Sequence, residues 1–259
     1  MPPGMKLADS FREDARGGKA PVVPFFPFPT GDPSPLFDRV VALCETRPTT
    51  ALGLVFPGRR VLDGVSGRRP AGRPVLEWDL FQFLFALKQR TGMPTVLAVH
   101  YRDILDFGIY PYAQEGHKVG LDLLLVRDPI LDELDYFTAE VVAGGIGFGV
   151  VAGAGFTADA AGRARPYLSG PVCFPDGITP PGPARLFSET TLPALFRAPP
   201  CPGRPGSGPL PCLPREASDR AGWYLEVPAL RPGLGPAGTR AWSERLDAAV
   251  RGLREAGRG

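Results

Sequence analysis

Short apolar runs alternate with amphipathic stretches along most of this sequence. The apolar runs have the length of strands and are bounded by Gly, Pro or Asp residues that favour turns. They predict strands over residues 21–28, 51–56, 95–99, 121–126, 146–152, 171–174 and 223–227. Apolar residues at helical spacing predict helices over residues 36–44, 76–90, 107–118, 131–142 and 242–253. In the second of these helices, Trp78, Phe81, Leu84 and Phe85 are expected on the buried side.

This alternation of strands and helices predicts an α/β fold with a parallel sheet, because each parallel connection needs a crossover. The strands are almost continuously apolar, as expected when both faces of the sheet are covered. The pattern favours a (β/α)8 TIM barrel, and an open doubly wound sheet is the alternative. No GxGxxG motif follows a predicted strand, which weakens the open-sheet alternative.

Glycine and proline are unusually abundant, with 33 Gly and 32 Pro among 259 residues. In the first part of the chain they separate the predicted elements, as expected for turns. Between residues 199 and 214 they are too dense for a helix or a central strand, which predicts a loop or disordered insertion. We therefore expect a polar segment over residues 1–20 and a single barrel-like domain over 21–259 that carries this insertion.

Charge and composition exclude several classes of protein. The formal net charge is only +2, which argues against a nucleic-acid binder. The four cysteines form no CxxC pair and there are only two histidines, so we expect no metal site and no cofactor. The N-terminal segment is polar and no apolar run is long enough to cross a membrane, so we expect a cytoplasmic protein without membrane contact.

Several stretches, taken in order, resemble the tryptophan synthase alpha subunit family. They cover most of the chain and are FFPFPTGDPS (25–34), ALGLVFPGRRVLDG (51–64), TVLAVHYRDILDFGI (95–109), VGLDLLLVRDP (119–129), GFGVVAGAGFTA (147–158) and PVCFPDGITPP (171–181). The resemblance implies a (β/α)8 barrel that cleaves indole-3-glycerol phosphate into indole and glyceraldehyde 3-phosphate. It also implies a tryptophan synthase beta subunit as partner and an indole-type ligand.

The chemistry of this family needs a carboxylate as acid/base and a second one that holds the indole N–H. The position of the acid/base glutamate is Gly53 here, so that group is missing, whereas Asp63 matches the second carboxylate. The sixth-strand tyrosine of the family is expected at Gly149. The resemblance also makes Tyr101, Asp103 and Asp128 candidate substrate-binding residues, although strand-end capping is the alternative role for each.

Two further positions match the phosphate loops of the family. Thr157 matches the threonine of the loop after the sixth strand, and Gly177 is the last glycine of the loop after the seventh. Pro175 and Asp176 replace the rest of that loop, which removes a backbone donor and adds a charge that repels phosphate. The Gly-Ser pair of the eighth strand is expected near Glu226.

Only one helix and one strand fit between Asp128 and Thr157, where the family has two strands. We therefore expect a degenerate barrel with about one βα unit missing. His100 is expected to be a packed or partly exposed ring rather than a catalyst.

Three hypotheses follow from the resemblance and its departures. The chain is a divergent lyase with impaired chemistry, a non-catalytic member that binds a partner or ligand, or a decayed gene product without a stable fold.

Overall fold

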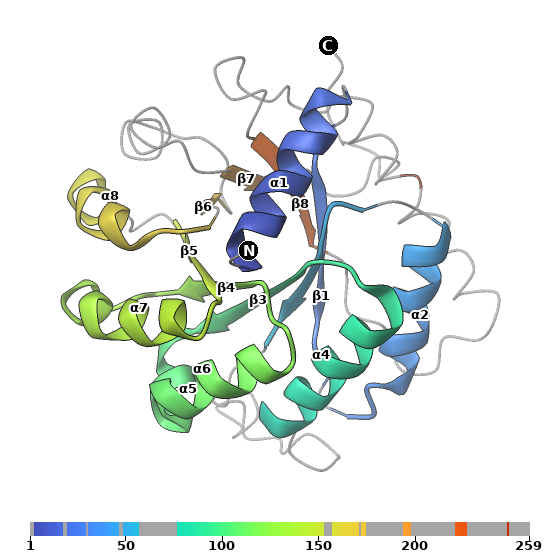
Figure 1. Ribbon diagram of the computed structural model, residues 1–259, viewed down its shortest axis with the longest axis horizontal. Helices are drawn as coiled ribbons and strands as arrows, with labels where there is room; N and C mark the ends of the chain where they lie inside the picture. Colours follow the sequence, from blue (N-terminus) through green and yellow to red (C-terminus); the bar gives the residue numbers. More distant parts are fainter. Residues whose placement is uncertain are drawn as a thin grey trace, which may run out of the picture.

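Eight parallel strands close into a barrel in the computed structural model of this chain (Figure 1). The structure describes residues 3–17, 20–29, 31–46, 49–56, 77–152, 157–170, 172–174, 194–197, 221–226 and 248. Neighbouring strands follow chain order, and β8 pairs with β1. The strands are β1 Val22–Pro27, β2 Leu52–Val55, β3 Thr95–His100, β4 Leu123–Arg127, β5 Gly147–Val151, β6 Val172–Phe174, β7 Ala194–Arg197 and β8 Ala221–Glu226. This closure confirms the predicted TIM barrel and excludes the open sheet.

Most of the described helices lie outside the ring of strands, as parallel crossovers require (Figure 1). They are α2 Ser34–Thr46, α4 Glu77–Thr91, α5 Tyr101–Phe107, α6 Ile109–Lys118, α7 Leu134–Ala143 and α8 Ala158–Ala164, with short 3₁₀ turns η1 Leu131–Glu133 and η2 Arg165–Tyr167. Helix α5 follows β3 directly, in a stretch for which the sequence predicted neither a helix nor a strand. No helix in the described part of the chain is long and apolar enough to cross a membrane.

The N-terminal helix α1 (Pro3–Arg16) packs against the strands β4 and β5. It occupies most of the segment over residues 1–20 that was predicted only to be polar. Its Leu7 and Phe11 are buried in the same cluster as the inward-facing residues of the barrel. Asp14 accepts a hydrogen bond from the Thr50 hydroxyl at 2.6 Å, and this hydroxyl accepts one from the Val22 N–H at 2.9 Å. Helix α1 therefore covers the end of the barrel where β1 and β2 begin.

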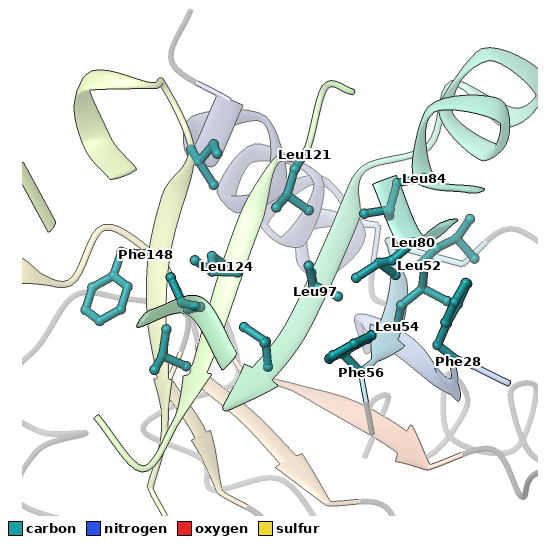
Figure 2. Close-up of a cluster of buried hydrophobic side chains, with 14 of the residues drawn as sticks. Phe28, Leu52, Leu54, Phe56, Leu80, Leu84, Leu97, Leu121, Leu124 and Phe148 are labelled. Atoms are coloured by element: carbon teal, nitrogen blue, oxygen red, sulfur yellow. The ribbon is translucent and has the colours of Figure 1, made fainter. Parts of the chain in front are cut away.

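Side chains on successive strand residues point to opposite faces, and this divides the core into two clusters. The interior cluster includes Phe25, Val96, Ala98, Leu123 and Leu125. The outer cluster lies between strands and helices and includes Leu52, Leu54, Leu97 and Leu124 from strands, with Leu80 and Leu84 from α4 (Figure 2). The near-continuous apolar strands therefore serve both faces of the sheet.

The buried side of α4 agrees only in part with the sequence prediction. Phe81 and Leu84 are buried, but Phe85 is 48% exposed. Leu80, Leu84 and Leu87 form the centre of the buried face. Phe85 lies at the margin of this face, because it is rotated by roughly 140° from Leu80 about the axis of a regular helix. The prediction that Phe85 is buried is therefore wrong.

The prediction of a missing strand is wrong, because the barrel closes with eight strands. The segment that the resemblance matched to the sixth strand contains β5, and the segment that it matched to the seventh contains β6. The seventh position is filled by β7, a four-residue strand that the apolar pattern did not reveal. Gly149 therefore lies on the fifth strand and does not correspond to the sixth-strand tyrosine of the resembling family.

Several predicted features lie outside the described residues. They are Asp63, Gly177, the insertion over residues 199–214 and, apart from the helical residue Ala248, the final helix.

Candidate functional site at the mouth of the barrel

The carboxyl ends of the strands form the mouth of a TIM barrel, where the loops that carry chemistry begin. Three of the predicted site residues lie just beyond these ends. Tyr101 follows β3, Asp128 follows β4, and Thr157 lies between β5 and α8. The structure therefore brings the third- and fourth-strand residues to one edge of the barrel mouth.

Gly53 lies in the middle of β2, in register with Phe25 of β1 and Val96 of β3. Both neighbours belong to the interior cluster, so position 53 faces the inside of the barrel. A Cβ atom at Gly53 would lie 2.6 Å from Cγ and Cδ1 of the Phe25 ring. Phe25, which is 3% exposed, therefore occupies the place where a side chain at position 53 would begin.

Neither Glu45 nor Asp103 places a carboxylate at this position. Glu45 lies on α2 and forms a surface ion pair with Arg90 at 2.5 Å. Asp103 is buried in α5, on the outside of the barrel. Glu226 ends β8 in register with Phe25, so the eighth-strand position expected near it does lie at the mouth.

Tyr101 points away from the barrel interior and belongs to the outer cluster. Its ring packs edge-on against Phe137 of α7, with 5.3 Å between ring centroids. Its hydroxyl donates a 2.7 Å hydrogen bond to Oε2 of Glu133. Burial, followed by this hydrogen bond, raises the pKa of Tyr101 above its ordinary value. These contacts tie β3 to the segment after β4.

Asp128 has a backbone φ of 49°, the only positive φ of a non-glycine residue in the described part of the chain. Aspartate tolerates this left-handed conformation better than most residues. Its Oδ1 and Oδ2 both lie 3.2 Å from Nδ1 of His100, and Oδ1 accepts a 3.4 Å hydrogen bond from the Tyr101 N–H. The turn after β4 thus places a carboxylate against the last residue of β3.

His100 is a partly exposed ring, as expected, with a side chain that is 36% exposed. Its contact with Asp128 is the feature that the sequence did not predict. Two sequence signals could have identified it: a histidine at the end of a strand, and an aspartate directly after the next strand. Their pairing depends on the register of β3 and β4, in which His100 stands opposite Arg127.

Thr157 begins a helix in the structure. Its Oγ1 accepts a 3.2 Å hydrogen bond from the N–H of Ala160, as an N-cap residue does. Thr157 follows β5 and Gly177 follows β6 in the sequence. The resemblance assigned them to the loops after the sixth and seventh strands, so both residues come one strand earlier than expected. Within the described ranges, no group of three or more His, Cys, Asp or Glu side chains is placed to hold a metal ion.

No protein-family model matches this sequence, and no curated protein matches it either. Solved structures match its fold over almost the whole chain. Tryptophan synthase from M. tuberculosis has a TM-score of 0.70 and 16% identity, covering 98% of this chain and 98% of that one. Tryptophan synthase subunit alpha from Legionella pneumophila has a TM-score of 0.66 and 15% identity, covering 97% of each chain. The tryptophan synthase a2b2 complex from Pyrococcus furiosus contains a chain with a TM-score of 0.63 and 16% identity, covering 91% of this chain and 98% of that one. At such identities the likeness establishes the barrel fold.

Proposed function

We propose that this chain is a divergent tryptophan synthase alpha-subunit-like protein whose indole-3-glycerol-phosphate lyase activity is impaired. The barrel matches alpha subunits over nearly its full length, and motifs resembling theirs follow in the same order. The single observation that carries the impairment is the packing of Phe25 over Gly53.

Cleavage of indole-3-glycerol phosphate needs an acid/base group beside the glycerol carbon. Glycine at position 53 supplies no titratable group. The Phe25 ring fills the adjacent space, so a larger residue has no room there without a shift of that ring. The packing of Phe25 against Gly53 therefore supports a loss of the reaction. It does not support a carboxylate that has moved to a neighbouring position on the strand.

The direct test measures indole release from indole-3-glycerol phosphate, with an active alpha subunit assayed in parallel. The wild-type protein is expected to release no indole. Turnover near that of the active subunit would overturn the proposal.

Two variants test whether position 53 is the cause. Gly53→Glu alone is expected to stay inactive, because Phe25 blocks the new side chain. Phe25→Ala/Gly53→Glu makes room for the carboxylate and is expected to release indole faster than Phe25→Ala, its matched control. Equal rates for these two variants would contradict the assignment of the impairment to position 53.

A second candidate function is non-catalytic binding of a tryptophan synthase beta subunit or of an indole-type ligand. It is favoured by the complete closure of the barrel, which preserves a scaffold despite the missing acid/base group. The tryptophan synthase complex named above shows that a chain of this architecture assembles as an a2b2 complex. Size-exclusion chromatography with a purified beta subunit is expected to show co-elution, and separate elution would exclude this partner.

A further inference from the structure

His100 and Arg127 end neighbouring strands at the barrel mouth and stand in register with each other. Two residues earlier on the same strands, Ala98 and Leu125 belong to the interior cluster. Because side chains alternate along a strand, His100 and Arg127 lie on this same interior face, one layer nearer the mouth. The imidazole of His100 and the guanidinium of Arg127 therefore belong to neighbouring residues at the mouth, next to the apolar interior cluster.

Asp128 holds the His100 ring in a defined orientation. Both carboxylate oxygens lie 3.2 Å from Nδ1, and the Tyr101 N–H donates to the same carboxylate. A carboxylate on Nδ1 favours the tautomer with the proton on that nitrogen, which leaves the lone pair of Nε2 available. The positive φ of Asp128 is a backbone conformation that persists only where surrounding contacts hold it.

Two other acidic residues in the segment after β4 already have partners. Asp132 forms an ion pair with Arg163 of α8, and Glu133 accepts the hydrogen bond of the Tyr101 hydroxyl. No described residue forms an ion pair with Arg127, whose side chain is partly buried. A cation in such a place suits a ligand that brings its own negative charge.

We propose that Arg127, His100 and Asp128 form a binding site for a small oxyanion, a phosphate or a carboxylate. The Arg127 guanidinium binds the anionic oxygens, and His100 Nε2 forms the second hydrogen bond with the same ligand. Asp128 is the positioning residue that sets the tautomer of His100. The site lies between β3 and β4 and goes beyond the proposed loss of lyase activity, because it uses none of the residues on which that loss depends.

The first test reads the tautomer of His100 by ¹⁵N nuclear magnetic resonance at pH 8. His117 is the only other histidine and is exposed on α6, so it serves as an internal control in the same spectrum. His100 is expected to carry its proton on Nδ1 and His117 mainly on Nε2. Asp128→Gly, which removes the carboxylate but tolerates the positive φ, is expected to return His100 to the pattern of His117. An unchanged His100 pattern in this variant would overturn the role of Asp128.

The second test titrates inorganic phosphate and acetate separately, with sodium chloride at matched ionic strength as control. A saturable shift of the His100 resonances, without one at His117, is expected with at least one anion, and the responding anion identifies the source of the oxyanion. Arg127→Met is expected to weaken binding about tenfold or more. Arg102→Met, which changes an exposed arginine paired with Asp106, is the matched control and is expected to leave binding unchanged. No saturable shift with either anion, or equal weakening by both variants, would overturn the site.

Discussion

The ring of Phe25 lies against the Cα of Gly53, so closely that a Cβ atom there would approach it to 2.6 Å. The two residues are paired in register on β1 and β2 and face the barrel interior. The bulk of Phe25 and the absence of a side chain at position 53 are therefore complementary. A side chain at position 53 therefore requires the Phe25 ring to move, so any carboxylate placed there is coupled to the packing of the barrel.

Gly53→Ala is expected to lower the free energy of unfolding by about 1–3 kcal/mol, because a methyl group overpacks the interior beside Phe25. The measurement is urea unfolding followed by circular dichroism. Gly162→Ala is the matched control, since no atom lies within 4 Å of a Cβ at that position in α8. It is expected to be neutral or stabilising, because alanine favours helices. Equal stability of Gly53→Ala and wild type would contradict the packing described here.

Much of the fold could be predicted from the sequence because the strands are buried on both faces and read as continuous apolar runs. β1, β3 and β4 are examples, each within one or two residues of its predicted bounds. β7 was not predicted, because its four residues are too few to show a recognisable pattern of apolar positions. That single omission produced the wrong expectation of a missing unit and moved the later loops by one position.

The site could be predicted only as far as strand ends. Tyr101 and Asp128 were correctly placed after neighbouring strands, since parallel strands end at the same edge. The contact between His100 and Asp128 depends on strand register and on the positive φ of Asp128. Neither feature can be predicted from the residues nearby in the sequence. The absence of a carboxylate at Gly53 could be read directly, but the ring that fills its place could not.

The buried ion pair between Lys88 of α4 and Asp122 is expected to stabilise the barrel. Asp122, whose side chain is 3% exposed, also accepts a 2.9 Å hydrogen bond from the Thr95 N–H. Lys88→Met leaves this buried carboxylate without its cation and is expected to cost about 3 kcal/mol in unfolding free energy. Glu45→Gln, which breaks an exposed pair with Arg90, is the control and is expected to cost less than about 1 kcal/mol. Similar costs in urea unfolding would show that burial does not distinguish the two pairs.

The Cys44 thiol is expected to react slowly in the folded protein. Burial raises its pKa from 9.0 to about 11, so the fraction of thiolate at pH 8 falls about 100-fold. A thiolate of higher pKa is also more nucleophilic, which offsets part of this loss. Alkylation by iodoacetamide at pH 8, followed at the Cys44 peptide by mass spectrometry, is therefore expected to be at least about tenfold slower than in urea-unfolded protein. A rate like that of the unfolded chain would mean that the thiol is not shielded in solution.

Tyr101 is expected to ionise later than an exposed tyrosine, since burial and its hydrogen bond to Glu133 raise its pKa. The stability that this adds is fully present below the ordinary tyrosine pKa of about 10 and is lost as the pH rises toward the folded value. Phenolate absorbance is therefore expected to show a late phase that is smaller in Tyr101→Phe than in wild type, because Tyr167, whose pKa is also raised by a hydrogen bond to Asp135, still contributes to it.

Tyr110→Phe, at a residue that is 55% exposed, is the matched control and is expected to keep the late phase. Tyr101→Phe is also expected to cost about 1–2 kcal/mol in unfolding free energy at pH 7, because Glu133 loses its hydrogen-bond donor. This difference from wild type is expected to shrink above pH 10, where the unfolded state gains by releasing the Tyr101 proton. A stability difference that stays constant with pH would show that the Tyr101 hydroxyl is not held in the environment described.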